Sequence, residues 1–452
     1  MRIFDAATAV MKQGGKRRGA NMGILSADHP DIVEFISAKA DLTTLSNFNI
    51  SVGVTDDFME RAAKQQDWPL INPHTNKKVR TMGAHTLFEL IVTNAWRTGD
   101  PGLIFLDEIN RRNPTPHLGR LEATNPCGEL PLLPYESCNL GSINLAKMVR
   151  GGRIDWDRLA EVTALGVRFL DNVVEANRFP LPEIEAITHG NRKVGLGVMG
   201  FADALIQLGI PYDSEEAVDI GERIAAFIFD HAVKASEDLA VKRGAFPNFH
   251  DSVYDMTGVP PRRNATVVSI APTGTISIIA GCSSGIEPLF ALAYLRNVMG
   301  GVKLLEVNPY FEQALRDRGL HSAELMRKVA EAGSIRGLAE LPEDMRRVYV
   351  TDFDIRPEWH VRMQAAFQRH CDNAVSKTVN LPADTSVEEV RRIYLLAHEL
   401  KCKGITVYRY GSRPEQVLTR VEDTTRFELE GQGLLSAEAE YAGGCPGAIC
   451  PA

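Results

Sequence analysis

The spacing of apolar and polar positions is helical over much of the chain. In residues 155–177, apolar side chains recur about once per helical turn, which predicts an amphipathic helix with one buried face. The apolar positions that give this pattern are Leu159, Val162, Leu165 and Leu170. A second long helix is predicted for residues 214–243.

Short strand-like runs lie between the predicted helices, each bounded by Gly, Pro, Asn or Asp. These runs are residues 48–54, 143–145, 265–270 and 404–408. Because helices alternate with short strands, the sequence predicts an α/β protein with a largely parallel sheet.

The amino-acid composition changes near the end of the sequence. From about Gly411 the chain is polar and acidic, and its last residues include Cys445 and Cys450. We therefore interpret residues 1–410 as the folded portion and residues 411–452 as a flexible tail that carries two thiols.

Composition excludes several classes of partner. The 452 residues are 44% hydrophobic and 24% charged, with a formal net charge of -8. This charge gives no electrostatic case for nucleic acid or a membrane as the main partner. The longest apolar runs, such as residues 224–229, are too short to span a bilayer, so a cytoplasmic location is expected. Seven cysteines are too few and odd in number for a secreted disulfide framework.

The most informative cysteine is Cys127, in the run Asn125, Pro126, Cys127, Gly128, Glu129. Pro and Gly disfavour regular structure and favour a tight loop that can present the sulfur. In an extended loop, the amide and the carboxylate two residues away can lie on the same side as the thiol. The alternative is a buried cysteine in an ordinary turn, the usual place of an isolated thiol.

Two further loops could bind phosphate. Residues 271–277 follow a predicted strand, and their hydroxyls, glycine and backbone N–H groups suit an anion, although an ordinary strand-to-helix turn is the alternative. The candidate ligands are Pro272, Thr273, Gly274, Thr275 and Ser277. The second loop, residues 14–21, contains Lys16, Arg17 and Arg18 and could equally be a solvated basic loop.

Other motifs give weaker hypotheses. Residues 195–200 match the glycine fingerprint of dinucleotide-binding folds, but the preceding residues are a poor core strand and no acidic residue follows at the usual distance. We expect these glycines to allow close packing of a helix. The tail pair Cys445 and Cys450 could be half of a zinc site, but no third or fourth ligand stands nearby, so no metal is expected. Core packing is the better interpretation of Cys282, Cys371 and Cys402.

The Cys127 loop, with a second cysteine at Cys138, resembles the finger loop of class II, adenosylcobalamin-dependent ribonucleotide reductases. Further similar segments are residues 47–52, 192–201, 272–277, 376–382 and 403–411. Class I subunits usually carry two adjacent tyrosines near the chain end, whereas Arg409 separates Tyr408 from Tyr410 here, which favours the cobalamin-dependent class.

The resemblance implies a role for each residue of the loop. Cys127 would carry a thiyl radical that abstracts the ribose 3′ hydrogen, while Asn125 holds the ribose hydroxyls. Glu129 would act as base on the 3′ hydroxyl. Cys138 would be one member of the redox pair, re-reduced by Cys445 and Cys450 with electrons from a thioredoxin-type reductant.

The resemblance also implies the ligands and the wider fold. Residues 272–277 would hold the substrate phosphates, most simply a diphosphate, and Lys16, Arg17 and Arg18 would relay the identity of a dNTP or ATP effector. The implied fold is an incomplete ten-stranded α/β barrel with a central finger loop, because the family has a substantial region before residue 14. We expect an N-terminal complement chain or a homo-oligomer to complete it, and the alternative function is a non-catalytic, nucleotide-binding or assembly half of a split reductase.

Overall fold

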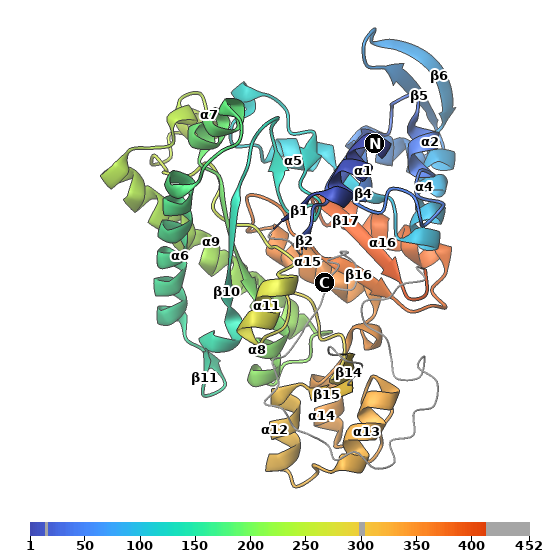
Figure 1. Ribbon diagram of the computed structural model, residues 1–452, viewed down its shortest axis with the longest axis vertical. Helices are drawn as coiled ribbons and strands as arrows, with labels where there is room; N and C mark the ends of the chain where they lie inside the picture. The colour runs from blue at the N-terminus through green and yellow to red at the C-terminus, as the bar shows by residue number, and fades with distance from the viewer. Residues whose placement is uncertain (14–16, 298–302, 413–452) are drawn as a thin grey trace.

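The computed structural model describes residues 1–13, 17–297 and 303–412, and it consists of helices packed around short strands (Figure 1). The helices of this part are α1 Arg2–Val10, α2 Ile32–Ile36, α3 Asp56–Ala63, α4 Ala84–Thr98, α5 Leu106–Arg111, α6 Trp156–Ala176, α7 Pro182–Asn191, α8 Phe201–Leu208, α9 Glu215–Arg243, α10 Val253–Thr257, α11 Gly274–Ala280, α12 Pro309–Asp317, α13 Ala323–Ala332, α14 Glu343–Val348, α15 Pro357–Gln368 and α16 Val387–Glu399. Short 3-10 turns occupy Pro116–Leu118, Leu145–Met148, Pro247–Phe249 and Asp352–Asp354.

A five-stranded sheet in the order β16-β17-β7-β4-β3 forms one side of the molecule. Its strands are β3 Asn21–Ser26, β4 Phe48–Val54, β7 Gly102–Phe105, β16 Thr378–Leu381 and β17 Gly404–Arg409. All neighbouring pairs are parallel except β17 and β7, which run antiparallel. The sheet therefore joins two groups of parallel strands that run in opposite directions.

A second parallel pair, β10 Asn139–Asn144 and β13 Val194–Met199, extends one of these groups. A parallel bridge joins Leu196 of β13 to Val268, and another joins Ile270 to Val375, just before β16. The strand series is thus β10, β13, residues 268–270, β16, β17, β7, β4 and β3. Within the described residues this series does not close, because nothing pairs with the outer edges of β3 and β10. The observed fold agrees with the expected incomplete α/β barrel.

The remaining strands form antiparallel hairpins at the periphery or beside the strand series. They are β1 Lys12–Gln13 with β2 Arg17–Arg18, β5 Asp67–Asn72 with β6 Lys77–Gly83, β8 Ala123–Thr124 with β9 Pro131–Leu132, β11 Val149–Arg150 with β12 Arg153–Ile154, and β14 Ala293–Asn297 with β15 Lys303–Val307.

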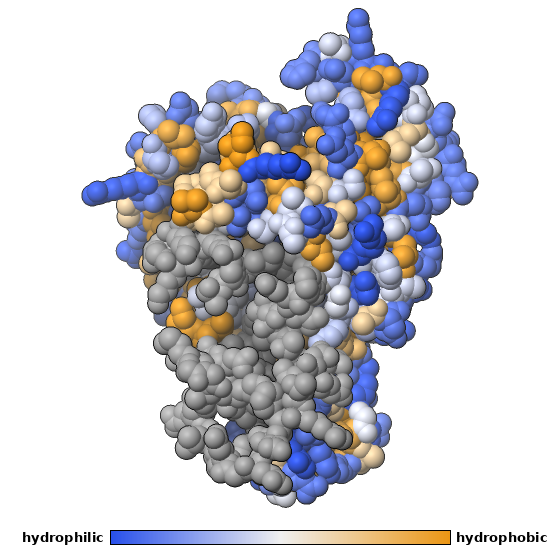
Figure 2. All heavy atoms as spheres, turned by 45° about the vertical axis from the view of Figure 1, so that its right-hand side comes forward, coloured by the Kyte–Doolittle hydropathy of each residue, from blue (hydrophilic) through white to orange (hydrophobic). Residues whose placement is uncertain are grey.

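Two large apolar cores lie along the strand series, and the second contains residues from strands of both parallel groups. Helices α6, α9 and α15 pack on the β10 and β13 group, and α3, α4 and α16 pack on the five-stranded sheet. Helices α12, α13 and α14 enclose a third, smaller cluster, at the bottom of Figure 1. Hydrophilic residues cover much of the face in Figure 2, with apolar patches between them. No helix in the described part of the chain is long and apolar enough to cross a membrane.

Local signals account for the elements that the sequence predicted well. Helix α6 begins after Asp155, whose carboxylate accepts the backbone N–H of Arg158 at 3.0 Å. Ser214 caps α9 in the same way. The pattern was wrong in one respect: Leu165 on α6 is 63% exposed, so the apolar positions do not all share the buried face. The interpretation of residues 191–194 as a poor core strand agrees with the structure, since α7 ends at Asn191 and β13 begins only at Val194.

Candidate functional site

The Cys127 loop is a tight turn between two short paired strands. Strands β8 and β9 pair antiparallel, and the Asn125 amide oxygen accepts the backbone N–H of Leu130 at 3.1 Å. The N–H of Gly128 donates to the carbonyl of Asn125 at 3.0 Å. Gly128 has a φ of +83°, which a residue with a side chain adopts only with strain. These bonds fix the loop, with Cys127 near its tip.

Both parallel groups of strands anchor this loop. Asn49 of β4 donates its side-chain N–H to the carbonyl of Pro126 at 2.7 Å. On the other side, the carbonyl of Glu129 accepts the Ser269 hydroxyl at 3.0 Å and the N–H of Ala374 at 2.9 Å. The loop thus lies between the two groups, as expected of a central finger loop.

Cys127 is half-buried and borders a cleft. Other lining residues come from both groups of strands and include Asn49, Ser51, Lys377, Thr378 and Tyr408. A ligand in this cleft would lie beside the sulfur.

Glu129 is a buried carboxyl group whose surroundings raise its pKa. It is 2% exposed, and its Oε2 has no hydrogen-bond partner in the described part of the chain. Burial raises the pKa of Glu129, while a hydrogen bond from Asn125 opposes the rise. The structure therefore joins Asn125 and Glu129 in one hydrogen-bonded unit.

Cys138 directly precedes β10 and lies beside a buried ion pair. Lys193 Nζ and Glu136 Oε2 are 2.7 Å apart. Burial raises the pKa of Cys138 well above its ordinary value; Lys193 lowers it, and the negative charges of Glu136, Asp372 and Glu129 raise it further. Cys138 is thus within electrostatic range of Glu129. None of the five cysteines that the structure describes is in a disulfide.

The predicted phosphate loop lies at the carboxyl end of a strand segment next to β16. Residues 271–273 lead into α11, and Thr273 adopts a left-handed conformation with a φ of +58°. The Thr273 hydroxyl accepts the N–H of Gly285 at 2.7 Å. Because Ile270 and Val375 bridge in parallel, the loop that follows Ile270 begins beside residues 376–377, which lead into β16.

Several predicted residues give no site geometry. Lys16, Cys445 and Cys450 lie outside the described residues, and Arg17 and Arg18 are described only as the backbone of β2, paired with β1. The structural role of Cys282, Cys371 and Cys402 is confirmed, since all three are buried.

The glycine fingerprint at residues 195–200 serves close packing, but against the segment around Ser269 rather than against the helix that we predicted. A Cβ added to Gly197 would lie 2.2 Å from the carbonyl oxygen of Ser269, and one added to Gly195 would lie 2.7 Å from the Ser269 Cβ. The segment around Ser269 occupies the space on this side of β13. The helix was the expected neighbour, and the segment that bridges to β13 is in fact the closer one.

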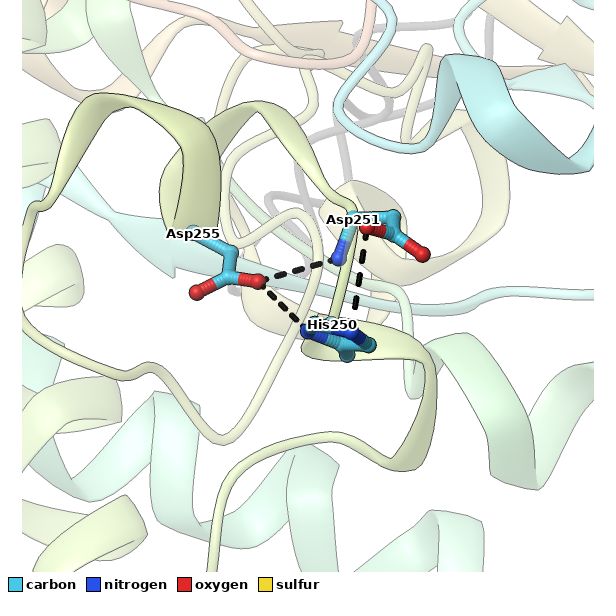
Figure 3. Close-up of side chains that lie close together, drawn as sticks. All are labelled: His250, Asp251 and Asp255. Carbon is cyan, nitrogen blue, oxygen red and sulfur yellow. Dashed lines mark hydrogen bonds and ion pairs between the residues drawn. The ribbon is translucent and has the colours of Figure 1, made fainter.

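One cluster of possible metal ligands occurs among the described residues: His250, Asp251 and Asp255, all exposed (Figure 3). The Asp255 carboxylate accepts the Asp251 N–H at 3.0 Å and contacts His250 Nδ1 at 2.8 Å. These bonds close the turn before α10, which accounts for the cluster without a metal.

Sequence reasoning missed two features of the site. One is Asn49, which holds the loop. The other is a buried cluster of four ionisable residues from separate segments: Glu287, Asp352, His360 and Lys377. No periodic pattern marks either feature, because each depends on contacts between residues far apart in the sequence.

Comparison with known proteins gives a consistent result. Residues 1–262 and 260–408 match the barrel domain of ribonucleotide reductase. The chain is 55% identical over 421 residues to a vitamin B12-dependent ribonucleoside-diphosphate reductase of Thermoplasma acidophilum, covering 93% of this chain and 55% of that protein. It is 52% identical to the protein of the same name from Mycobacterium tuberculosis, covering 100% of this chain and 62% of the relative.

The chain thus spans 55% and 62% of the lengths of these two relatives. A solved structure, the alpha subunit of a class Id ribonucleotide reductase from Actinobacillus ureae, superposes with a TM-score of 0.74 at 24% identity. That alignment covers 91% of this chain and 73% of the solved one, and it supports the fold alone.

Proposed function

Because the chain belongs to the ribonucleotide reductase family, we propose that it carries the residues that reduce ribonucleoside diphosphates to deoxyribonucleotides. The observation that supports this most directly is the position of Cys127. It is half-buried at the edge of a cleft, on a loop that both groups of strands hold, and it is two residues from a buried carboxyl group. The names of the relatives at 55% and 52% identity support the diphosphate as substrate.

In the proposed reaction, a Cys127 thiyl radical takes the 3′ hydrogen of the ribose and later returns it. Glu129 accepts the proton of the 3′ hydroxyl, for which its raised pKa suits it. The 2′ hydroxyl leaves with a proton as water. Cys138 and a second thiol supply two electrons and two protons, and they become a disulfide.

We assign adenosylcobalamin as the cofactor from the names of the relatives. The site fits such a group in one respect: Cys127 is only half-buried at the border of a cleft, so its sulfur can be approached from outside. Asn49, Pro126 and Tyr408 line the same cleft and would border the bound group. When bound, the cofactor supplies the radical; the protein's part is to hold Cys127 in place through Asn125 and Asn49.

The remaining ligands follow from the other predicted sites. Residues 272–277 would hold the substrate diphosphate through the N–H groups that begin α11. Lys16, Arg17 and Arg18 would respond to a dNTP or ATP effector. Cys445 and Cys450 would pass electrons from a thioredoxin-type protein to the disulfide of Cys138.

A second candidate function is that of a nucleotide-binding half that works only after assembly with a complement. No described strand pairs with the outer edges of β3 and β10, which favours assembly. In this case the isolated chain binds nucleotide without turnover.

The test is to incubate the purified chain with adenosylcobalamin, CDP and a dithiol, and to measure dCDP by chromatography. Cys127→Ser should abolish dCDP formation and leave CDP binding nearly unchanged, because an O–H bond is too strong to yield the radical. The matched control, Cys402→Ser in the core, should retain turnover. Activity in Cys127→Ser equal to that of the unchanged chain would remove Cys127 from the mechanism.

Two more arms separate the remaining assignments. Replacing Cys445 and Cys450 by Ser should stop turnover with a thioredoxin-type reductant and spare turnover with small dithiols. Equal loss with both reductants would make the tail cysteines structural. CDP binding without any dCDP would favour the assembly function.

A further inference from the structure

A cluster of four ionisable side chains lies buried behind the wall of the cleft. Lys377 precedes β16, Glu287 follows α11, His360 is on α15, and Asp352 begins a 3-10 turn. Each is less than a tenth exposed. Burial of charged groups costs free energy unless they are paired, and the proposed reaction uses none of the four.

Lys377 is the centre of this cluster. Its ammonium donates to the Glu287 carboxylate and lies 3.1 Å from Nδ1 of His360. Glu287 also accepts the backbone N–H of Thr378 at 2.9 Å. Glu287 therefore contacts both the side chain of Lys377 and the backbone of Thr378. Lys377 and Thr378 are among the residues that line the cleft beside Cys127.

The chain of contacts continues beyond Lys377. An ammonium group has no acceptor, so Nδ1 of His360 must accept and the proton of the neutral ring is on Nε2. Nε2 lies 3.8 Å from Asp352 Oδ1, and neither atom has a hydrogen-bond partner within the described ranges. The other oxygen of Asp352 accepts the Asn380 side chain at 2.5 Å. His360 thus contacts Lys377 directly, and Asp352 lies next to His360.

Burial changes the ionisation of three groups around Lys377. Burial raises the pKa of Asp352 to about 8, against the pull of Lys377, and burial lowers the pKa of His360 well below its ordinary value. The Tyr212 ring, 5.9 Å from Lys377 Nζ, is also buried, which raises the pKa of its hydroxyl. Lys377 and Glu287 form a buried ion pair.

Glu287 ends a segment that is bonded to the predicted phosphate loop. Gly285 donates its N–H to the Thr273 hydroxyl at 2.7 Å, and the Ser277 and Ser284 hydroxyls are 3.0 Å apart. A movement of Glu287 would reach residues 273–277 through these contacts.

We propose that Lys377 is a positioning residue for the substrate diphosphate: its bond to Glu287 fixes the 272–277 loop relative to the cleft that contains Cys127. This inference rests on the proposed function. Lys377 itself does not touch the diphosphate, because its side chain is 0% exposed.

The test compares the dissociation constants of CDP and CMP by calorimetry, because their ratio isolates the terminal phosphate. In Lys377→Met we expect the preference for CDP to fall by about tenfold, equivalent to about 1.4 kcal/mol. A residue that only supports the fold would lower the fraction of competent protein and leave this ratio unchanged. An unchanged ratio in Lys377→Met would overturn the proposal while the proposed function stands.

Two further variants keep the test decisive. Lys403→Met is the matched control: Lys403 is equally buried, but its ammonium donates to the Asp372 carbonyl at 2.7 Å, so the ratio should be unchanged there. In the double variant Lys377→Met with Glu287→Gln, no charge is left unpaired and the new amide oxygen can still accept the Thr378 N–H. The double variant should fold even if the single variant does not, and it should recover part of the preference for CDP over CMP.

The outcomes separate the two proposals. If the unchanged chain binds CDP no more tightly than CMP, the assignment of residues 272–277 to the diphosphate is wrong, and the positioning role is wrong with it. If Lys403→Met lowers the ratio as much as Lys377→Met does, the effect belongs to any buried lysine and the proposal is overturned.

Discussion

At the scale of single residues, burial and hydrogen bonding set the chemistry of Glu129. The chain holds many glutamates on its surface, where water stabilises the charged form. Glu129 instead is 2% exposed and has an oxygen with no hydrogen-bond partner in the described residues, so the neutral form is favoured and the pKa rises. A base is useful when its pKa lies close to the working pH.

We predict that turnover rises with pH through the raised pKa of Glu129. Only the deprotonated carboxylate can accept the proton, so activity is lost as the pH falls below that pKa, which lies above the ordinary glutamate value of about 4.3. Glu129→Gln should lower kcat by roughly 100- to 10,000-fold at every pH and abolish this acidic limb. The measurement is kcat against pH. The exposed Glu122→Gln is the control, and an acidic limb that persists in Glu129→Gln would assign it to another group.

At the scale of elements, the position of β13 depends on a side chain being absent. Glycine at residue 197 lets the carbonyl of Ser269 approach to a distance at which any Cβ would clash. This contact joins β13 to the segment that leads into the phosphate loop, through the bridge between Leu196 and Val268. The glycines of this strand therefore hold two neighbours of the strand series together.

We predict that Gly197→Ala destabilises the chain. The new methyl group would lie 2.2 Å from a backbone oxygen, which cannot move as a flexible side chain can. The expected loss in the free energy of unfolding is about 1–3 kcal/mol, measured by urea denaturation. Gly337→Ala, where the added Cβ meets nothing within 4 Å, should change stability by less than about 0.5 kcal/mol. Equal effects of the two substitutions would contradict the packing explanation.

At the scale of the whole molecule, the strand series formed by the described residues is open at β3 and β10. The outer edges of these strands present N–H and C=O groups that no described strand pairs with. Exposed apolar side chains occur in the same parts of the chain: Leu140 on β10 is 39% exposed, and Ile3 on the α1 helix before β3 is 83% exposed. Proteins usually pair or cover such edges.

We predict that a polypeptide with the family's remaining barrel strands binds these edges and raises the thermal midpoint of the chain. The rise should grow with the concentration of the added polypeptide, as it does for any ligand that binds only the folded state. Differential scanning calorimetry gives the midpoint, and an unrelated α/β polypeptide of similar length is the control. A midpoint that stays constant at saturating complement would mean that the edges are not its binding site.

The sequence by itself determined the features that depend on neighbouring residues. The extent of α6 and α9 follows from periodic apolar positions and from the caps at Asp155 and Ser214, and the bounds of β4 equal the predicted run of residues 48–54. The Cys127 loop was also evident, because Pro and Gly act on the backbone within a few residues.

Only the tertiary structure decided which distant residues share a site. Burial raises the pKa of Glu129 and of Asp352, and burial is a property of the packed chain rather than of a sequence window. The hydrogen bond from Asn49 to Pro126 joins residues 77 positions apart in the sequence, and the bond from Lys377 to Glu287 joins residues 90 positions apart. Pairing across such separations depends on how the strands are ordered in space, and no local periodicity encodes that order.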